Sequence, residues 1–266
     1  MRVRVRVSRE RMAQALGIGP LTARSVALSA LLGSHPPRLP SRSLVAMGSL
    51  FGIADGAMRT ALSRMVVSGE VELDGSGYVL GERLRRRQTS QDVTRRPRTE
   101  PWDDTWRFAI VDAERRPIGE RRAFRAMMGE HRMAELRPEV WLRPANIDGP
   151  EPIDGALIVR GGIAGRDPVR LVGQLWDLPT IAGKAVELTG LVEQACSWLD
   201  RNDPTSLAET FLVSIAVVRF LRTEPQLPTA LVGTGWPPER LRAAYDRLES
   251  AHLARMTSFL ATAAQA

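Results

Sequence analysis

Residues 41–80 read SRSLVAMGSLFGIADGAMRTALSRMVVSGEVELDGSGYVL, and this stretch carries the clearest structural pattern of the N-terminal third of the chain. Its first ten residues carry apolar side chains at helical spacing, and Gly52 then breaks the pattern with a tight turn. A second helix is predicted over residues 54–68, and Gly69 ends it. Two short apolar runs flank the Asp-Gly-Ser-Gly sequence of residues 74–77, which is typical of a β-hairpin loop. The order helix, turn, helix, hairpin predicts a winged helix-turn-helix.

The predicted helix over residues 54–68 has an apolar face and a polar face. Met58, Leu62 and Met65 recur at helical spacing on the apolar face, which we expect to be buried. The polar face carries arginine and hydroxyl side chains, which hydrogen-bond base edges and phosphates in a major groove. Arginines upstream of this helix suit bidentate pairing with phosphate. The residues expected to contact DNA are Arg38, Arg42, Arg59, Thr60, Ser63 and Arg64.

The positive charge is concentrated in the same part of the chain. Residues 1–100 carry 17 arginines against 8 acidic residues, whereas residues 101–266 carry 20 basic against 22 acidic residues. A basic excess around a helix-turn-helix is the electrostatic footprint of a domain that contacts phosphates. Arginine outnumbers lysine 36 to 1 over the whole chain, so arginine abundance alone is no evidence. A helical hairpin with solvated arginines, or a winged helix that docks a protein partner, is the alternative.

Basic segments flank the predicted helix-turn-helix on both sides. Residues 2–7 alternate arginine and valine, which fits an edge strand, a basic arm that enters a minor groove, or a segment without function. Helices are predicted over 8–16 and 22–33, and a proline-rich connector follows at 34–40. A helix over 81–98 carries seven arginines and either is solvated or lies near the DNA backbone.

The middle of the chain predicts an α/β domain. Residues 106–112 read as a buried strand, and residues 115–131 as a basic amphipathic helix. Further strands are expected at 133–136, 140–142, 156–159 and 169–175. The β-α-β order followed by more strands fits a ferredoxin-like sandwich.

The C-terminal third is predicted to be helical. Helices are expected near 180–201, 205–223 and 237–262, with prolines between the last two. The fold class is therefore α+β, with an N-terminal winged helix-turn-helix, a central ferredoxin-like α/β sandwich and a C-terminal helical domain. The predicted domains cover residues 1–98, 99–175 and 176–266.

Sequence motifs for catalysis and metal binding are absent. The three histidines, at positions 35, 131 and 252, lie in separate predicted elements without metal-ligand spacing. Neither a phosphate-binding loop nor a Gly-x-Ser-x-Gly elbow occurs in the sequence. We therefore expect no enzymatic activity, no cofactor and no metal. The alternative is a metal-dependent nuclease that uses Asp112 as a ligand.

The sequence also predicts the compartment. Cys196 is the sole cysteine, so no internal disulfide can form. No apolar run reaches the roughly 18 residues of a membrane span, and the first residues lack the apolar core of a signal peptide. We expect a cytoplasmic protein without a membrane partner.

Five short segments along the chain form one ordered pattern. They are Met58–Met65 with Gly69, Trp106-Arg107 leading to Asp112, Val140–Pro144, Trp176–Leu178, and Glu224–Pro228 with Leu231 and Trp236-Pro237. Together they resemble the PaaX family of bacterial transcriptional repressors, over about residues 20–262. The hairpin departs from that family, because Glu70, Glu72 and Asp74 stand where a basic wing is usual.

The resemblance implies a dimeric repressor that binds double-stranded operator DNA near its own regulon. The best-known family members release DNA when an aryl-acetyl coenzyme A thioester binds. A homodimer with a small-molecule effector, an acyl-CoA thioester among the candidates, is therefore expected here. The helix around Val217–Arg219 is apolar where aromatic and polar residues are usual, so the effector is expected to differ from the phenylacetate thioester.

Overall fold

The computed structural model describes residues 9–19, 21–75, 77–95, 99–111, 118–147, 153, 155–201 and 206–263. These residues form eleven helices and two small antiparallel sheets, so the mixed α/β character is confirmed. The chain divides into two compact units, each built from segments that are distant in sequence. The first unit takes in residues 1–92, 188–218 and 243–266, and the second takes in 93–187 and 219–242. The predicted arm at 2–7 lies outside the described residues.

Four helices open the first unit. They are α1 (Arg9–Ala15), α2 (Ala23–Leu32), α3 (Ser41–Leu50) and α4 (Asp55–Val67). Helix α2 begins with a capping box, in which Thr22 Oγ1 accepts from the Ser25 amide and Ser25 Oγ accepts from the Thr22 amide. Gly52, with φ 72°, makes the tight turn between α3 and α4. The helices predicted at 22–33 and 54–68 are confirmed.

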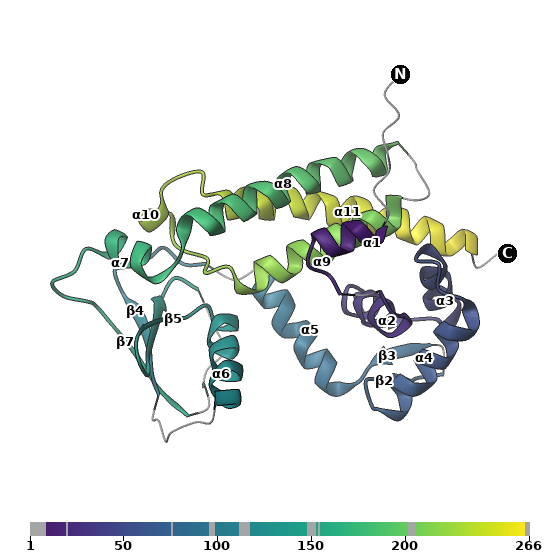
Figure 1. Cartoon of the computed structure of the whole chain (residues 1–266), viewed down its shortest axis with the longest axis horizontal. Helices are drawn as coiled ribbons and strands as arrows, with labels where there is room; N and C mark the ends of the chain where they lie inside the picture. The colour runs from purple at the N-terminus through teal and green to yellow at the C-terminus, as the bar shows by residue number, and fades with distance from the viewer. Residues whose placement is uncertain are drawn as a thin grey trace. The chain divides into compact units, whose positions relative to one another are not determined.

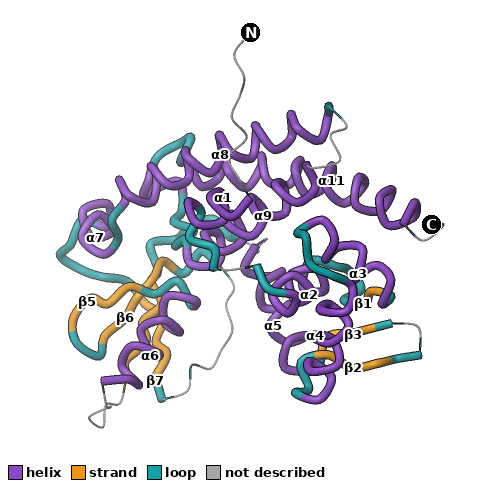
Figure 2. The backbone as a smooth tube through the Cα atoms, turned by 45° about the vertical axis from the view of Figure 1, so that its right-hand side comes forward, coloured by secondary structure: helices purple, strands orange, loops and turns teal. Residues whose placement is uncertain are grey.

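A three-stranded antiparallel sheet lies beside these helices, as Figure 2 shows. Its order is β1-β3-β2, with strands β1 (Arg38–Leu39), β2 (Val71–Leu73) and β3 (Tyr78–Leu80). Strands β2 and β3 are the predicted hairpin, and Leu73 pairs with Tyr78 next to its loop. Strand β1 falls in the proline-rich connector, where the sequence predicts no strand. Prolines beside it are tolerated because β1 is an edge strand. Helix α5 (Glu82–Arg95) follows the hairpin.

Three long helices run through the last third of the chain and confirm the helices predicted there. They are α8 (Leu178–Asp200), α9 (Ser206–Thr223) and α11 (Pro237–Ala263). Each of them has residues in both units. In the first unit, Leu212 of α9 packs with Ala13 and Ile18. The sequence predicts three domains with boundaries at residues 98 and 175, whereas the structure divides into two units built from other segments. The three-domain division stays a prediction.

The second unit contains a four-stranded antiparallel sheet. Its order is β5-β6-β4-β7, with strands β4 (Trp106–Val111), β5 (Ala134–Arg137), β6 (Val140–Pro144) and β7 (Ala156–Gly161). Helix α6 (Ile118–Glu130) lies against one face of this sheet (Figure 1). On that face, Met128 packs with Trp141. On the other face, Trp106 and Leu142 pack with α7 (Pro168–Leu175) and α10 (Thr229–Val232).

The strand predicted at residues 169–175 is wrong, because this segment is helix α7. Asp167 caps the helix by accepting a hydrogen bond from the Val169 amide at 3.1 Å, and Pro168 occupies its first turn. Alternation of valine, arginine and leucine imitates a strand at the start of the segment. The buried residues are nevertheless Leu171 and Val172, which are adjacent and share a helical face.

Candidate nucleic-acid interface

Helix α4 separates its apolar side chains from its polar ones. Met58, Leu62 and Met65 are completely buried, in a helix that contacts both α2 and α3. Asp55 lies in the first turn, where a negative charge complements the helix dipole. Gly69, with φ 70°, adopts the left-handed conformation that ends the helix. This packing fixes which face of α4 is turned toward solvent.

The solvent face of α4 carries all four residues predicted there. Arg59, Thr60, Ser63 and Arg64 are exposed. Thr60 Oγ1 donates to the carbonyl of Gly56 at 2.8 Å, and Ser63 Oγ donates to the carbonyl of Arg59 at 3.1 Å. Each hydroxyl has a single proton, so both oxygens are left as acceptors toward solvent. The outward donors are the guanidinium groups of Arg59 and Arg64, which have no ion-pair partner within the described ranges.

The two arginines predicted upstream of α4 have different surroundings. Arg42 is exposed in the first turn of α3 and forms no ion pair with any residue that the structure describes. Arg38 in β1 pairs with Asp74 in the hairpin loop, with 2.7 Å between Nη2 and Oδ2. The structure therefore leaves Arg42 available to a ligand, whereas the hairpin holds Arg38.

The three acidic residues of the hairpin region each have an arginine partner. Asp74 pairs with Arg38, and Glu72 Oε2 lies 3.5 Å from Arg85 Nη1. Glu70 is held by an arginine of α2. Because each carboxylate is balanced locally, the hairpin repels a phosphate backbone less than its sequence suggests.

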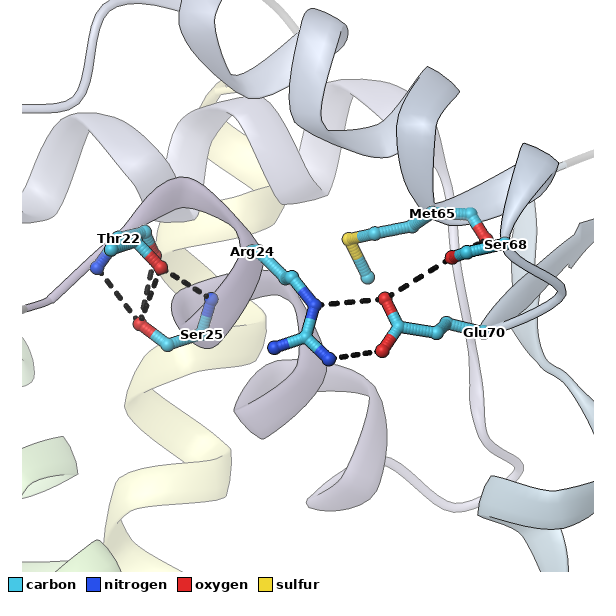
Figure 3. A network of polar contacts seen from close by, with 6 residues as sticks. All are labelled: Thr22, Arg24, Ser25, Met65, Ser68 and Glu70. Atoms are coloured by element: carbon cyan, nitrogen blue, oxygen red, sulfur yellow. Dashed lines mark hydrogen bonds and ion pairs between the residues drawn. The ribbon is translucent and has the colours of Figure 1, made fainter.

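The partner of Glu70 is Arg24, and this pair joins the start of α2 to the end of α4 (Figure 3). Arg24 Nε donates to Glu70 Oε2 at 2.8 Å, and Nη2 donates to Oε1, which makes the contact bidentate. Ser68 Oγ also donates to Glu70 Oε2, at 3.4 Å. Hydrogen bonding to Arg24 lowers the pKa of Glu70 and raises the pKa of Arg24. The pair thereby holds the C-terminal end of α4 against α2.

Helix α5 presents a second basic surface. Its inward residues are Leu84 and Gln88, which are both buried. Gln88 Nε2 donates to the carbonyl of Leu32, the last residue of α2, at 2.8 Å and to the carbonyl of Ser34 at 2.9 Å. These contacts fix the rotation of α5 about its axis. Among the α5 side chains whose burial is described, the exposed arginines are Arg83, Arg86 and Arg87.

The chain is similar to one protein family and to a solved structure. No curated protein matches it. A family model described as "PaaX-like protein" matches residues 22–84, which run from the cap of α2 into α5. The solved structure of the uncharacterized protein Rv0674 from Mycobacterium tuberculosis is 36% identical, with a TM-score of 0.72. That match covers 90% of this chain and 99% of Rv0674. The chain belongs to the PaaX-like family.

Membership of the PaaX-like family confirms the resemblance and indicates a transcriptional regulator in general terms, with DNA as the general partner. All six predicted DNA-contacting residues lie within the matched segment. Their individual contacts with DNA stay predictions.

The outward face of α4 in this PaaX-like protein includes two residues that the sequence reasoning missed. Gly56 and Val67 are exposed and continue the row of Thr60 and Ser63 in steps of three or four residues. Helical spacing alone identifies both positions. The Arg24–Glu70 pair was also missed, because its members are 46 residues apart and have no local signal.

Of the other acidic candidate residues of this PaaX-like chain, the structure describes only some. Within the described ranges, no three His, Cys, Asp or Glu side chains are arranged to hold a metal ion. Asp103 accepts from the Thr105 amide at 3.2 Å and lies 3.6 Å from Arg160, while Asp112 is outside the described residues. Among the helices that the structure describes, none combines the length and apolar character needed to cross a bilayer.

Proposed function

We propose that this PaaX-like protein is a sequence-specific DNA-binding repressor. In this proposal α3 and α4 act as a helix-turn-helix, α4 is the recognition helix, and the β2–β3 hairpin is the wing. The observation that carries the proposal is the exposed polar face of α4 opposite its completely buried apolar face. The basic excess of residues 1–100 supports it, because non-specific attraction to phosphates comes from such a surface.

The finer features of the proposal concern assembly and control. A homodimer presents two recognition helices, so half-sites related by dyad symmetry are expected about 10 base pairs, or a multiple of that, apart. In the second unit, the strand order β5-β6-β4-β7 with α6 between β4 and β5 supports a ferredoxin-like arrangement. A small-molecule effector makes the protein release DNA if the effector binds the DNA-free state more tightly than the DNA-bound state. The protein acts in the cytoplasm.

Binding to the DNA upstream of the protein's own gene tests the proposal. Fluorescence anisotropy of this segment and of random duplex DNA is measured at two salt concentrations. Tighter binding to the upstream segment, which weakens steeply with salt, is the expected result. Affinity without any salt dependence, or no affinity, would point to a winged helix that docks a protein.

Matched arginine variants locate the contact surface. Arg59→Gln and Arg64→Gln should each weaken specific binding by about 1–3 kcal/mol if they read guanine. Arg170→Gln is the control, because it removes the same charge from an exposed position on α7. An equal loss on upstream and random DNA would reassign the arginine to a phosphate contact.

The proposal includes no chemical step and no cofactor. Incubation of DNA with the full chain and Mg²⁺ or Mn²⁺ tests this point directly. Cleavage that Asp112→Asn abolishes would replace the repressor proposal with a nuclease.

A further inference from the structure

A row of side chains runs along the middle of the outward face of α4, and this row ends in an apolar residue at the C-terminus of the helix. Gly56, Thr60, Ser63 and Val67 follow one another along this face, with Arg59 and Arg64 on either side. The side chain of Val67 is 90% exposed, more than any other large hydrophobic residue of the described chain. An exposed valine at the C-terminal end of the outward face of α4 has a chemical consequence if that face meets DNA.

The hydroxyl protons of the same row are used in hydrogen bonds within α4. Thr60 Oγ1 donates its only proton to the carbonyl of Gly56, so the side chain offers a γ-methyl group and an acceptor oxygen, but no donor. Ser63 Oγ is likewise bonded to the carbonyl of Arg59. The row therefore offers methyl groups at Thr60 and Val67, and the donors lie at its flanks.

We propose that Thr60 and Val67 determine sequence specificity by contacting the 5-methyl groups of thymines. The thymine methyl is the apolar group that base pairs present in the major groove, and an apolar side chain distinguishes it from cytosine and from purines. This inference rests on the proposed function, since it requires α4 to lie in the groove. The flanking arginines are then left to guanine or phosphate.

Helix geometry sets the distance between the two thymines. Thr60 and Val67 are two helical turns apart, which corresponds to about 10 Å along the axis. Successive base pairs of B-DNA are about 3.4 Å apart, so for a helix lying along the groove the thymines are separated by about three base pairs. Each half-site should contain this pair of thymines.

Exchange of thymine for deoxyuridine isolates the methyl group. Bound sequences are first selected from a random duplex library with the full chain. Each thymine of the selected site is then replaced singly by deoxyuridine, which removes one methyl group and no hydrogen-bonding atom. The wild-type protein should lose about fourfold in affinity at two positions of each half-site, the factor expected for one buried methyl group.

Three variants assign these positions. Val67→Ser should abolish the sensitivity to deoxyuridine at one thymine. Thr60→Ser, which keeps the hydroxyl and removes the methyl, should abolish it at the other. Val186→Ser is the control, because Val186 is also an exposed valine on a helix, at 61% exposure on α8, and should behave as wild type.

Two results would overturn the inference, and they differ from failure of the proposed function. If a sequence is selected but no deoxyuridine replacement changes the affinity, the methyl contacts do not exist. If Val67→Ser keeps the wild-type sensitivity at every position, Val67 is a solvated valine without a role. Failure of the library to yield any enriched sequence would instead remove the repressor proposal, and this inference with it.

Discussion

The rings of Phe51 and Phe211 are in contact, with their centroids 5.4 Å apart and their planes tilted by 56°. Phe51 lies in the turn between α3 and α4, and Phe211 lies in α9. Phe211 also lies 6.4 Å, centroid to centroid, from the ring of His252 in α11. The turn that orients α4 is therefore packed on the C-terminal helices within the first unit.

A double-mutant cycle should detect this contact. Phe51→Leu and Phe211→Leu each keep an apolar side chain but remove the interaction between the two rings. We expect a coupling free energy of about 0.5–1.5 kcal/mol, as for other aromatic pairs. The measurement is urea unfolding of the wild type, both single variants and the double variant. Strictly additive losses would show that the rings contribute nothing beyond the burial of their area.

Removal of Arg24 should destabilise the first unit. Arg24→Gln leaves the largely buried Glu70 without its bidentate partner. Because the Arg24 side chain is 57% exposed and solvent screens the pair, we expect a loss of about 1–2 kcal/mol in the free energy of unfolding. The folded-state pKa of Glu70 is lowered, so the stabilisation by the pair is complete above pH 4.5 and is lost progressively as the pH falls from 4.5 through the lowered pKa. Denaturation midpoints at pH 7 and pH 3.5 measure the effect. The Arg24→Gln loss should be smaller at pH 3.5, and a loss of equal size at both pH values would contradict the electrostatic role.

Protonation of His252 should destabilise the protein in mild acid. Its Nδ1 lies 2.8 Å from Thr210 Oγ1, and burial lowers the pKa of His252 from 6.5 to about 4. The neutral form is favoured in the folded state, so its contribution to stability is complete above pH 6.5 and declines as the pH falls toward 4. The decline is at most about 3 kcal/mol, at about 1.4 kcal/mol for each unit of pKa shift.

A variant without this histidine isolates its share of the pH dependence. The stability of His252→Asn should fall less steeply between pH 6.5 and pH 4 than that of the wild type. Burial also lowers the pKa of His131, which remains in both proteins and cancels in the comparison. Parallel stability curves would exclude His252 as the source.

Gly81 should not tolerate a side chain. A β-carbon at this position would lie 2.2 Å from the carbonyl oxygen of Gly69, and the Gly81 amide donates to the Glu70 carbonyl at 2.8 Å. The obstacle is backbone, so Gly81→Ala should cost about 3 kcal/mol, the upper end of the range for overpacking. Gly190→Ala in α8 is the control, because nothing lies within 4 Å of its β-carbon position and alanine favours a helix. Thermal unfolding distinguishes a loss at Gly81 from a small gain at Gly190.

Local elements could be predicted because neighbouring residues carry their signals. The periodicity of residues 54–68 correctly separated the buried methionines of α4 from its exposed arginines, and the turn chemistry of residues 74–77 located the hairpin. The same reasoning from periodicity failed for residues 169–175, where it predicts a strand and the structure has helix α7. Seven residues are too few to distinguish alternation from a helical face when arginine stands between apolar residues.

Contacts between distant residues could not be predicted. The Arg24–Glu70 pair and the Phe51–Phe211 contact depend on how separate elements come together, and neither has a local pattern. The acidic hairpin is an example of an error that follows when such contacts are unknown. From the sequence its carboxylates count against a DNA contact, whereas the structure pairs them with arginines of α2, β1 and α5.

The core of the first unit brings together residues that are far apart in the sequence, and this affects how the chain folds during synthesis. Ala13 and Ile18 are covered by Leu212, so the N-terminal part cannot complete its packing until α9 has been synthesised. At about 5–20 residues per second, a ribosome needs roughly 10–40 s to travel that distance. During this time the apolar side chains of α1 lack the partner that covers them in the folded protein. Packing of α1 is thereby linked to synthesis of α9, whereas α2, α3 and α4 already contact one another within the N-terminal segment.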